Sequence, residues 1–114
     1  MARTRTTYDT FSAIAEPKRR ALLEVLAEEE MTVCELTDIM GWSQPTVSKH
    51  LAVLKDVHLV CEHRQGKFRV YRVNAEALKP VRQWVVQFER YWSQSLDQLD
   101  TYLIDLQSKG EKDD

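Results

Sequence analysis

The sequence predicts a mostly helical α+β domain of about five helices and one two-stranded β-hairpin. Apolar residues recur at helical spacing over most of the chain, which indicates amphipathic helices. The three prolines, Pro17, Pro45 and Pro80, each stand where such a pattern begins, because the first helical residue needs no backbone N–H donor. Two β-prone runs, LVCEHR and FRVYRV, flank Gln-Gly-Lys, which is typical of a hairpin.

The composition is that of an ordinary soluble protein. The chain has 114 residues, of which 43% are hydrophobic and 30% charged, so we expect a single domain. No apolar run is long enough to span a membrane, and the polar start MARTRTTYD lacks the apolar core of a secretory signal. Two cysteines make no disulfide framework. We therefore expect a cytoplasmic protein without a membrane partner.

Two helices are expected at the beginning of the domain. The first covers about residues 9–15, with Phe11 and Ile14 on one face, and residues 1–8 form a flexible arm before it. The second begins at Pro17, and its apolar side consists of Leu22, Leu23, Val25 and Leu26.

A pair of helices follows with a very short connection. Thr32 begins the first of them with the T-x-x-E pattern of a capping box, and Gly41 ends it because glycine readily adopts left-handed backbone. Ser43 caps the second, which extends to about residue 56. Two helices joined in this way make a helix-turn-helix, whose second helix can enter the major groove of DNA.

The last predicted element is a long amphipathic helix over about residues 80–106, followed by a disordered tail at 107–114. At about 1.5 Å per residue this helix would extend for roughly 40 Å, further than a small domain can cover. Its apolar stripe comprises Val81, Val85, Phe88, Trp92, Leu96, Leu99, Leu103 and Leu106.

Charge is distributed unevenly along the chain, although the net charge is only −2. Residues 21–42 contain six acidic residues and no Lys or Arg, whereas residues 43–72 contain six Lys or Arg and two acidic residues. Local patches of charge, rather than the total, decide attraction to phosphate. The positive block coincides with the second helix of the pair and the hairpin.

The second helix of the pair presents polar side chains away from the core. With Val47, Leu51 and Leu54 turned inward, a step of about 100° per residue points Pro45, Thr46 and Lys49 outward. Such side chains can read bases, since Gln pairs with adenine, Lys donates to guanine and the Thr methyl meets the thymine methyl. The candidate DNA-binding residues of this helix and its cap are Ser43, Gln44, Pro45, Thr46, Ser48, Lys49 and His50.

The hairpin that follows carries Arg64, Lys67 and Arg69 near its turn, where cations could hold phosphates or enter the minor groove. A helix-turn-helix followed by a charged β-hairpin is the winged helix-turn-helix arrangement. The sequence therefore favours binding to double-stranded DNA.

Three segments, EPKRRALLEVL, TVCELTDIMGWSQPTVSKHLAVLKDVHLV and RQGKFRVYRV, together resemble the ArsR/SmtB winged-helix transcriptional repressors of bacteria and archaea. The resemblance covers about residues 9–106, and S-Q-P-x-V-S-x-H-L is its most specific part. It implies a homodimeric repressor that binds an imperfect inverted repeat overlapping a promoter, with release or retention set by a ligand or chemical signal.

The resemblance also implies that the first and last helices form the dimer interface. This agrees with the excess length of the last helix, although an intramolecular core is the alternative for its apolar stripe. The expected interface residues are Phe11, Ile14, Val85, Phe88, Trp92, Leu96, Leu99 and Leu103.

The chain departs from the family at two places. Before the Leu-Val that enters the wing the family usually has Gly, and this chain has His58, which tolerates left-handed backbone with some strain. Metal sensors of the family use a Cys-Val-Cys where this chain has Thr32-Val33-Cys34, or Asp, His and Glu ligands on the last helix, where no histidine occurs.

We therefore expect no metal cofactor, because a closed zinc or arsenite site takes about three or four soft or imidazole ligands. The ending QFERYWSQSLDQLDTYL resembles the branch of the family without metal ligands. Two alternatives are a dimer-bridging metal site at His50, His58 or His63, and a thiol switch at Cys34, whose place at a helix start favours the thiolate.

Other function classes have less support in the sequence. No paired carboxylates, nucleophile with base, phosphate loop or metal triad can be assembled, so we do not expect an enzyme. A winged helix that docks a protein is the stronger rival. Salt-dependent binding to duplex DNA would distinguish the two.

Overall fold

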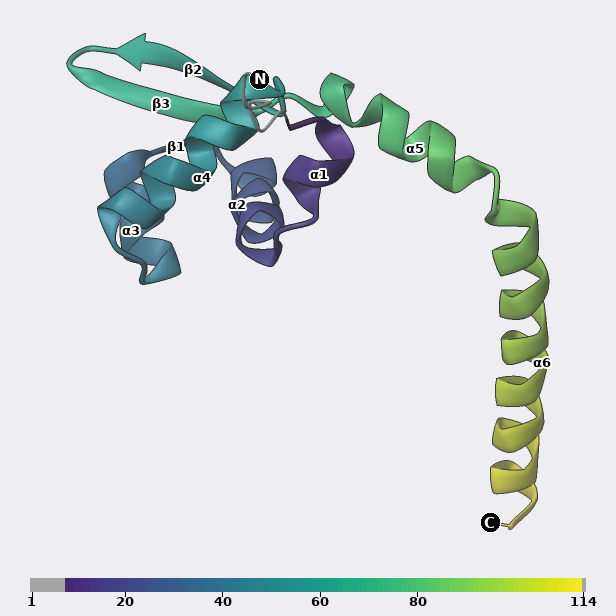
Figure 1. Ribbon diagram of the computed structural model, residues 1–114. Helices are drawn as coiled ribbons and strands as arrows, with labels where there is room; N and C mark the ends of the chain where they lie inside the picture. Colours follow the sequence, from purple (N-terminus) through teal and green to yellow (C-terminus); the bar gives the residue numbers. More distant parts are fainter. Residues whose placement is uncertain (1–7, 114) are drawn as a thin grey trace. The chain divides into compact units, whose positions relative to one another are not determined.

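The computed structural model describes the backbone of residues 8–113, and the side chains of that range except those of residues 94–97 and 108–113. Of the expected N-terminal arm, only Tyr8 lies within the described residues. The chain divides into two compact units, one ending at Val81 and the other beginning at Arg82. The first contains four α-helices and a small sheet, and the second consists of helix (Figure 1).

Two helices open the first unit. α1 (Thr10–Ile14) starts with a capping box, in which the Asp9 carboxylate accepts the N–H of Ser12 at 2.7 Å and the Ser12 hydroxyl accepts the N–H of Asp9 at 2.8 Å. α2 (Pro17–Glu28) has its proline in the first turn, where a missing N–H does no harm. Both helices lie where the sequence predicts them.

The next two helices form the predicted helix-turn-helix. α3 (Val33–Met40) begins with a reciprocal capping box at Thr32 and ends at Gly41, whose φ is +71°. α4 (Gln44–Asp56) begins three residues after Gly41, with the hydroxyl of Ser43 accepting a backbone N–H of the first turn. Local capping chemistry thus fixes both ends of the turn that separates the helices.

A three-stranded antiparallel sheet follows the order β1-β3-β2. The predicted hairpin is formed by β2 (Val60–Gln65) and β3 (Phe68–Val73), which we call the wing. A further strand, β1 (Met31–Thr32), pairs with β3 and was not predicted, because two residues are too short to show strand alternation. The wing tip projects beyond the helices of the first unit (Figure 1).

The core of the first unit lies where the two helix pairs meet the sheet. Val47, Leu51 and Leu54 of α4 are buried, so the predicted inward face is confirmed. The largest side chains that are fully buried are Leu22, Leu36, Leu51, Leu54, Leu59, Val47 and Val60.

α4 ends in a Schellman motif at the entrance to the wing. The N–H of Leu59 donates to the carbonyl of Leu54 at 2.9 Å, and the N–H of His58 donates to the carbonyl of Lys55 at 3.0 Å. This pattern needs left-handed backbone at the first residue after the helix cap. That residue is His58, and its φ is +63°. The predicted left-handed histidine is therefore confirmed.

The long last helix is divided, which corrects the prediction of one helix over 80–106. After η1 (Ala75–Leu78) the chain forms α5 (Lys79–Val86) and α6 (Glu89–Asp113). Between them the N–H of Phe88 donates to the carbonyl of Val85 at 2.9 Å, a tighter turn than an α-helix makes.

The break follows two adjacent β-branched residues, Val85 and Val86, which lose rotamer freedom in a helix. No Pro or Gly marks it and the apolar period continues across it, so periodicity alone predicts one helix. α6 also extends to Asp113, where the sequence predicts a disordered tail from residue 107. Among the described residues, no helix has the length and apolar character needed to cross a membrane.

Candidate nucleic-acid interface

The outward face of α4 is polar and accessible. Pro45 and Lys49 are exposed, as the helical period predicts, and so are Gln44 and Ser48, which flank them. Thr46, which was also predicted to point outward, is half-buried. Directly behind them Val47 is fully buried. The helix is therefore anchored by one side, and the other offers amide, hydroxyl and ammonium groups to a partner.

The start of α4 is held by two hydroxyl groups that bond to each other. The Ser43 and Thr46 hydroxyls lie 2.8 Å apart, and the Ser43 hydroxyl also accepts the N–H of Thr46 at 3.4 Å. Both side chains are thus used in capping, so the geometry of the first turn is fixed before any partner arrives.

His50 does not lie at the edge of the exposed face, which corrects the sequence expectation. Only 6% of the residue is accessible, and its Nδ1 lies 3.4 Å from Nη1 of Arg19. Because a guanidinium can only donate, Nδ1 accepts and the ring proton belongs on Nε2. Burial first, and then the charges of Arg19 and Lys49, lower the pKa of His50 below 6.5, so the ring is held neutral.

Arg19 is a buried cation that the sequence analysis missed. Its Nε donates to the carbonyl of Ala13 at 2.6 Å and its Nη2 to the carbonyl of Ser12 at 3.2 Å, both at the end of α1. The same guanidinium stacks over the ring of Tyr8, 5.2 Å from its centroid. One side chain thus connects α1, α2 and α4. The helical period contained the signal, since position 19 lies on the same face as Leu22, Leu23 and Leu26.

The wing brings the predicted cations together at its tip. Arg64 and Arg69 are directly opposite each other in the β2–β3 register, and Lys67 lies in the turn beside them. All three side chains are exposed. Like charges placed opposite each other weaken a hairpin, so this pair is unfavourable for the free protein.

An ion pair joins α4 to the wing. Nζ of Lys55 hydrogen-bonds Oε1 of Glu62, and this bond, followed by one from Tyr71, lowers the pKa of the Glu62 carboxyl. Burial, together with the neighbouring Glu62, raises the pKa of Tyr71 to about 12. The ion pair therefore fixes β2 of the wing to α4.

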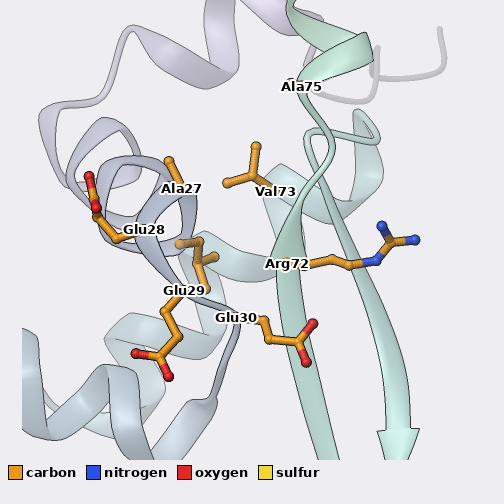
Figure 2. Close-up of a pocket in the computed structure, with 8 residues that line it drawn as sticks. Ala27, Glu28, Glu29, Glu30, Arg72, Val73 and Ala75 are labelled. Carbon is orange, nitrogen blue, oxygen red and sulfur yellow. The ribbon is translucent and has the colours of Figure 1, made fainter.

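Acidic residues gather at the other end of the wing. Glu28, Glu29 and Glu30 line a pocket of about 390 Å³ with Arg72 and other residues at the end of β3 (Figure 2). Their carboxylates point in different directions (Figure 2). Oε1 of Glu30 lies 3.9 Å from Nε2 of His63. The pocket does not gather the three carboxylates around a common point.

The donor atoms near the start of α3 do not fit a thiolate metal site. The hydroxyl of Thr32 is used in the cap of α3, and Cys34 is exposed as the second residue of that helix. Within the part of the chain that the structure describes, no three His, Cys, Asp or Glu side chains are grouped to hold a metal ion. The thiol-switch role of Cys34 stays a prediction.

The predicted interface residues are distributed over both units. In the first, Phe11 is 40% exposed and Ile14 packs against the core. In the second, Phe88, Trp92, Leu99 and Leu103 are between 37% and 49% exposed and Val85 is half-buried. The side chain of Leu96 lies outside the described residues.

The chain is similar in sequence to known bacterial regulators. Residues 16–61 match the family model described as bacterial regulatory protein, arsR family. The transcriptional repressor SdpR of Bacillus subtilis is 32% identical over 80 residues, which are 70% of this chain and 89% of that protein.

The chain is also similar to solved structures of bacterial regulators. The crystal structure of a possible transcriptional regulator for arsenical resistance has a TM-score of 0.63 and 34% identity, and covers 82% of this chain and 94% of its own. The homodimeric winged helix-turn-helix DNA-binding domain of a possible ArsR-family regulator from Mycobacterium bovis has a TM-score of 0.58 and 27% identity, and covers 68% of this chain and 75% of its own.

A helix-turn-helix with a capped, polar second helix, a basic wing fixed to that helix and relatives of this similarity lead to one assignment. The chain belongs to the ArsR family of bacterial regulatory proteins and is a winged helix-turn-helix transcriptional regulator.

Proposed function

We propose that the protein is a sequence-specific DNA-binding repressor that acts as a homodimer on an inverted-repeat operator without a metal effector. One observation carries this proposal. α4 is anchored by a fully buried apolar side, while its other side is exposed and polar, and an ion pair joins this helix to a basic wing. A helix with this asymmetry suits the major groove, and the cations of the wing suit the phosphates beside it.

The exposed residues of α4 are assigned to base recognition. Gln44 and Lys49 offer the donors and acceptors that read adenine and guanine, and Pro45 and Ser48 lie between them on the same face. Ser43 and Thr46 hold the first turn, and the methyl group of Thr46 remains available to a thymine. His50 supports Lys49 from behind and does not itself reach a base.

The three wing cations are assigned to the phosphate backbone. Arg64, Lys67 and Arg69 attract any duplex equally, so they contribute affinity and salt dependence but no discrimination between sequences.

Dimer formation is supported by the accessible apolar side chains of the second unit and by the similarity to a homodimeric domain. A homodimer presents two copies of α4, which fits an inverted repeat with half-sites one helical turn of DNA apart. The absence of a metal effector is supported by Thr32 in place of a thiolate. SdpR, 89% of which is covered by the match to this chain, is named a transcriptional repressor.

The first test is selection of bound duplexes from a random pool, with and without zinc and an oxidant. On the selected duplex, a dimer that neutralises about eight phosphates should show a log–log salt slope near −7. Lys49→Ala should weaken binding to that duplex by roughly 1–3 kcal/mol and relax the preference for one base pair, because it removes a base contact.

Lys79→Ala is the matched control, since Lys79 is an exposed lysine paired with Glu76 outside α3, α4 and the wing. It should leave the affinity unchanged. Arg64→Ala should weaken selected and random duplexes alike. If the wild-type protein binds no duplex at low salt, DNA recognition is excluded and docking to a protein becomes the better explanation.

A further inference from the structure

The wing tip carries an aromatic side chain that the fold does not use. Phe68 is the first residue of β3, directly after the turn, and is 52% exposed. The partly buried side chains that pack on the described core include Tyr71 and Val73 of the same strand, but not Phe68. Figure 1 shows the tip projecting beyond the helices of the first unit. A large apolar ring that is exposed at such a place contributes little to the stability of the unbound protein.

The surroundings of this ring are cationic. Nζ of Lys67 lies 5.5 Å from the centroid of the Phe68 ring, and the opposed Arg64 and Arg69 follow in the next pair of the register. None of these three cations forms an ion pair with an acidic side chain among the described residues. Side chains alternate along a strand, so Arg64 and Arg69 project from the hairpin face opposite Phe68. A ring at a tip that carries these unpaired cations matches a partner that presents a narrow slot between two rows of anions.

We propose that Phe68 is an apolar wedge that enters the minor groove of DNA and partly separates two stacked base pairs. This inference rests on the proposed function, and it names a contact outside the major groove. The minor groove is about 6 Å wide, its walls are phosphate-lined and its floor exposes base edges, so a ring can enter while Arg64 and Arg69 stay with the phosphates. Side chains that enter in this way kink the duplex by about 20–90°.

The wedge gives selectivity at positions that α4 does not touch. Pyrimidine–purine steps such as TA and CA unstack most easily, so the operator should carry one beneath each wing tip. A dimer would insert two rings, one beside each half-site, and bend the DNA at both places.

The experiment uses the full-length protein and the selected duplex. Bending is measured by energy transfer between dyes at the two duplex ends, and unstacking by the fluorescence of 2-aminopurine placed at the step beneath the wing. Phe68→Ala should remove the bend and the fluorescence increase, and lower the affinity about tenfold. Phe68→Leu, which keeps an apolar wedge, should retain both signals.

The salt slope separates this proposal from a simpler role for the ring, which is to hold Lys67 in place. A wedge carries no charge, so Phe68→Ala should leave the slope as it is, whereas Lys67→Ala should reduce it by about one unit per protomer. A changed slope in Phe68→Ala, an unbent wild-type complex, or an unaltered bend in Phe68→Ala would each overturn the wedge.

These outcomes are distinct from failure of the proposed function. If wild-type protein binds its duplex in a Lys49-dependent way while Phe68→Ala behaves like wild type, only the wedge is wrong. If no duplex is bound, both are wrong. Because Phe68 is exposed, its substitution should not change thermal unfolding, and an unchanged melting temperature is the control for folding.

Discussion

The buried pair of Arg19 and His50 lies immediately behind the exposed face of α4. Arg19 is bonded to carbonyls at the end of α1 and His50 belongs to α4, so this pair connects the helix that carries Lys49 to α1. A second positive charge on the imidazole would lie 3.4 Å from the guanidinium, and the carboxylate of Glu16 offsets only part of this repulsion, since the pKa of His50 stays lowered. The packing of this face therefore favours the neutral state of His50.

This requirement predicts a pH dependence of stability. The unfolded chain takes up a proton at His50 as the pH falls through 6.5, and the folded protein does so only at lower pH. The contribution of neutral His50 to the free energy of unfolding should therefore be fully present above pH 6.5. It should be lost as the pH falls from 6.5 through the lowered pKa. Urea unfolding of wild type and His50→Asn between pH 7.5 and 5 measures it.

Asn is the matched substitution because its Oδ1 can accept from Arg19 but does not titrate in this range. His50→Asn should lose less stability than wild type on acidification. Equal losses in both proteins would show that another group is responsible.

The exposure of side chains in the candidate interface could be predicted from the sequence where the helical period determines which face a residue occupies. Pro45 and Lys49 are exposed because they lie opposite Val47 and Leu51 on the helix, and the exposed Gln44 and Ser48 flank them on one side. His50 could not be placed, since it lies at the boundary between the two faces and its burial depends on Arg19, which is distant in sequence. Phe68 was overlooked because a strand residue beside a turn can point to either the core or solvent.

Among the elements, helix ends are where local sequence and backbone geometry conflict most clearly. The Schellman motif after α4 places a histidine where glycine would be free of strain. The motif is nevertheless complete, because Leu54 and Leu59, which flank it, are both fully buried. Packing on either side thus holds His58 in the left-handed region.

Replacing His58 by Gly should therefore increase the free energy of unfolding by about 1 kcal/mol, as the relief of left-handed strain exceeds the entropy that glycine loses on folding. Urea midpoints at constant pH measure it. The control is His63→Gly, which places glycine in a strand with ordinary backbone and should be destabilising. If His58→Gly also destabilises the protein, the side chain makes a favourable interaction that outweighs the strain.

The elements themselves were largely predictable, because capping residues and apolar period agree for the four helices of the first unit. The strand β1 was missed because its pairing with β3 is a long-range event with no local pattern. The division between α5 and α6 was missed because the period of the apolar stripe continues through Gln87 and Phe88, where only hydrogen bonding changes.

At the scale of the whole molecule, the proposed dimer depends on which face of α6 meets the partner. Leu99 and Leu103 lie one turn apart on the apolar stripe, whereas Ile104 follows Leu103 by about 100° around the axis. Leu103 is 46% exposed and Ile104 is 61% exposed. Leu103 and Ile104 are thus both large, apolar and accessible, but they lie on different faces of α6.

Leu103→Asp should convert the protein to a monomer at micromolar concentration, because a buried, unpaired carboxylate would face the partner helix. Its salt slope for DNA binding should fall to about half. Ile104→Asp should remain a dimer. Sedimentation velocity measures both, and dimers of both variants, or a monomeric wild type, would contradict the proposed interface.

The two ends of β3 have opposite surroundings, with Lys67 and Arg69 at its beginning and three successive glutamates beside its end. A protein of small net charge can therefore still have a large dipole moment. In the field of a polyanion such a molecule experiences a torque, which would turn the wing towards DNA during the approach and keep the glutamates away from it. The arrangement thus favours productive encounters, and its effect belongs to the association rate constant, which should fall as ionic strength rises.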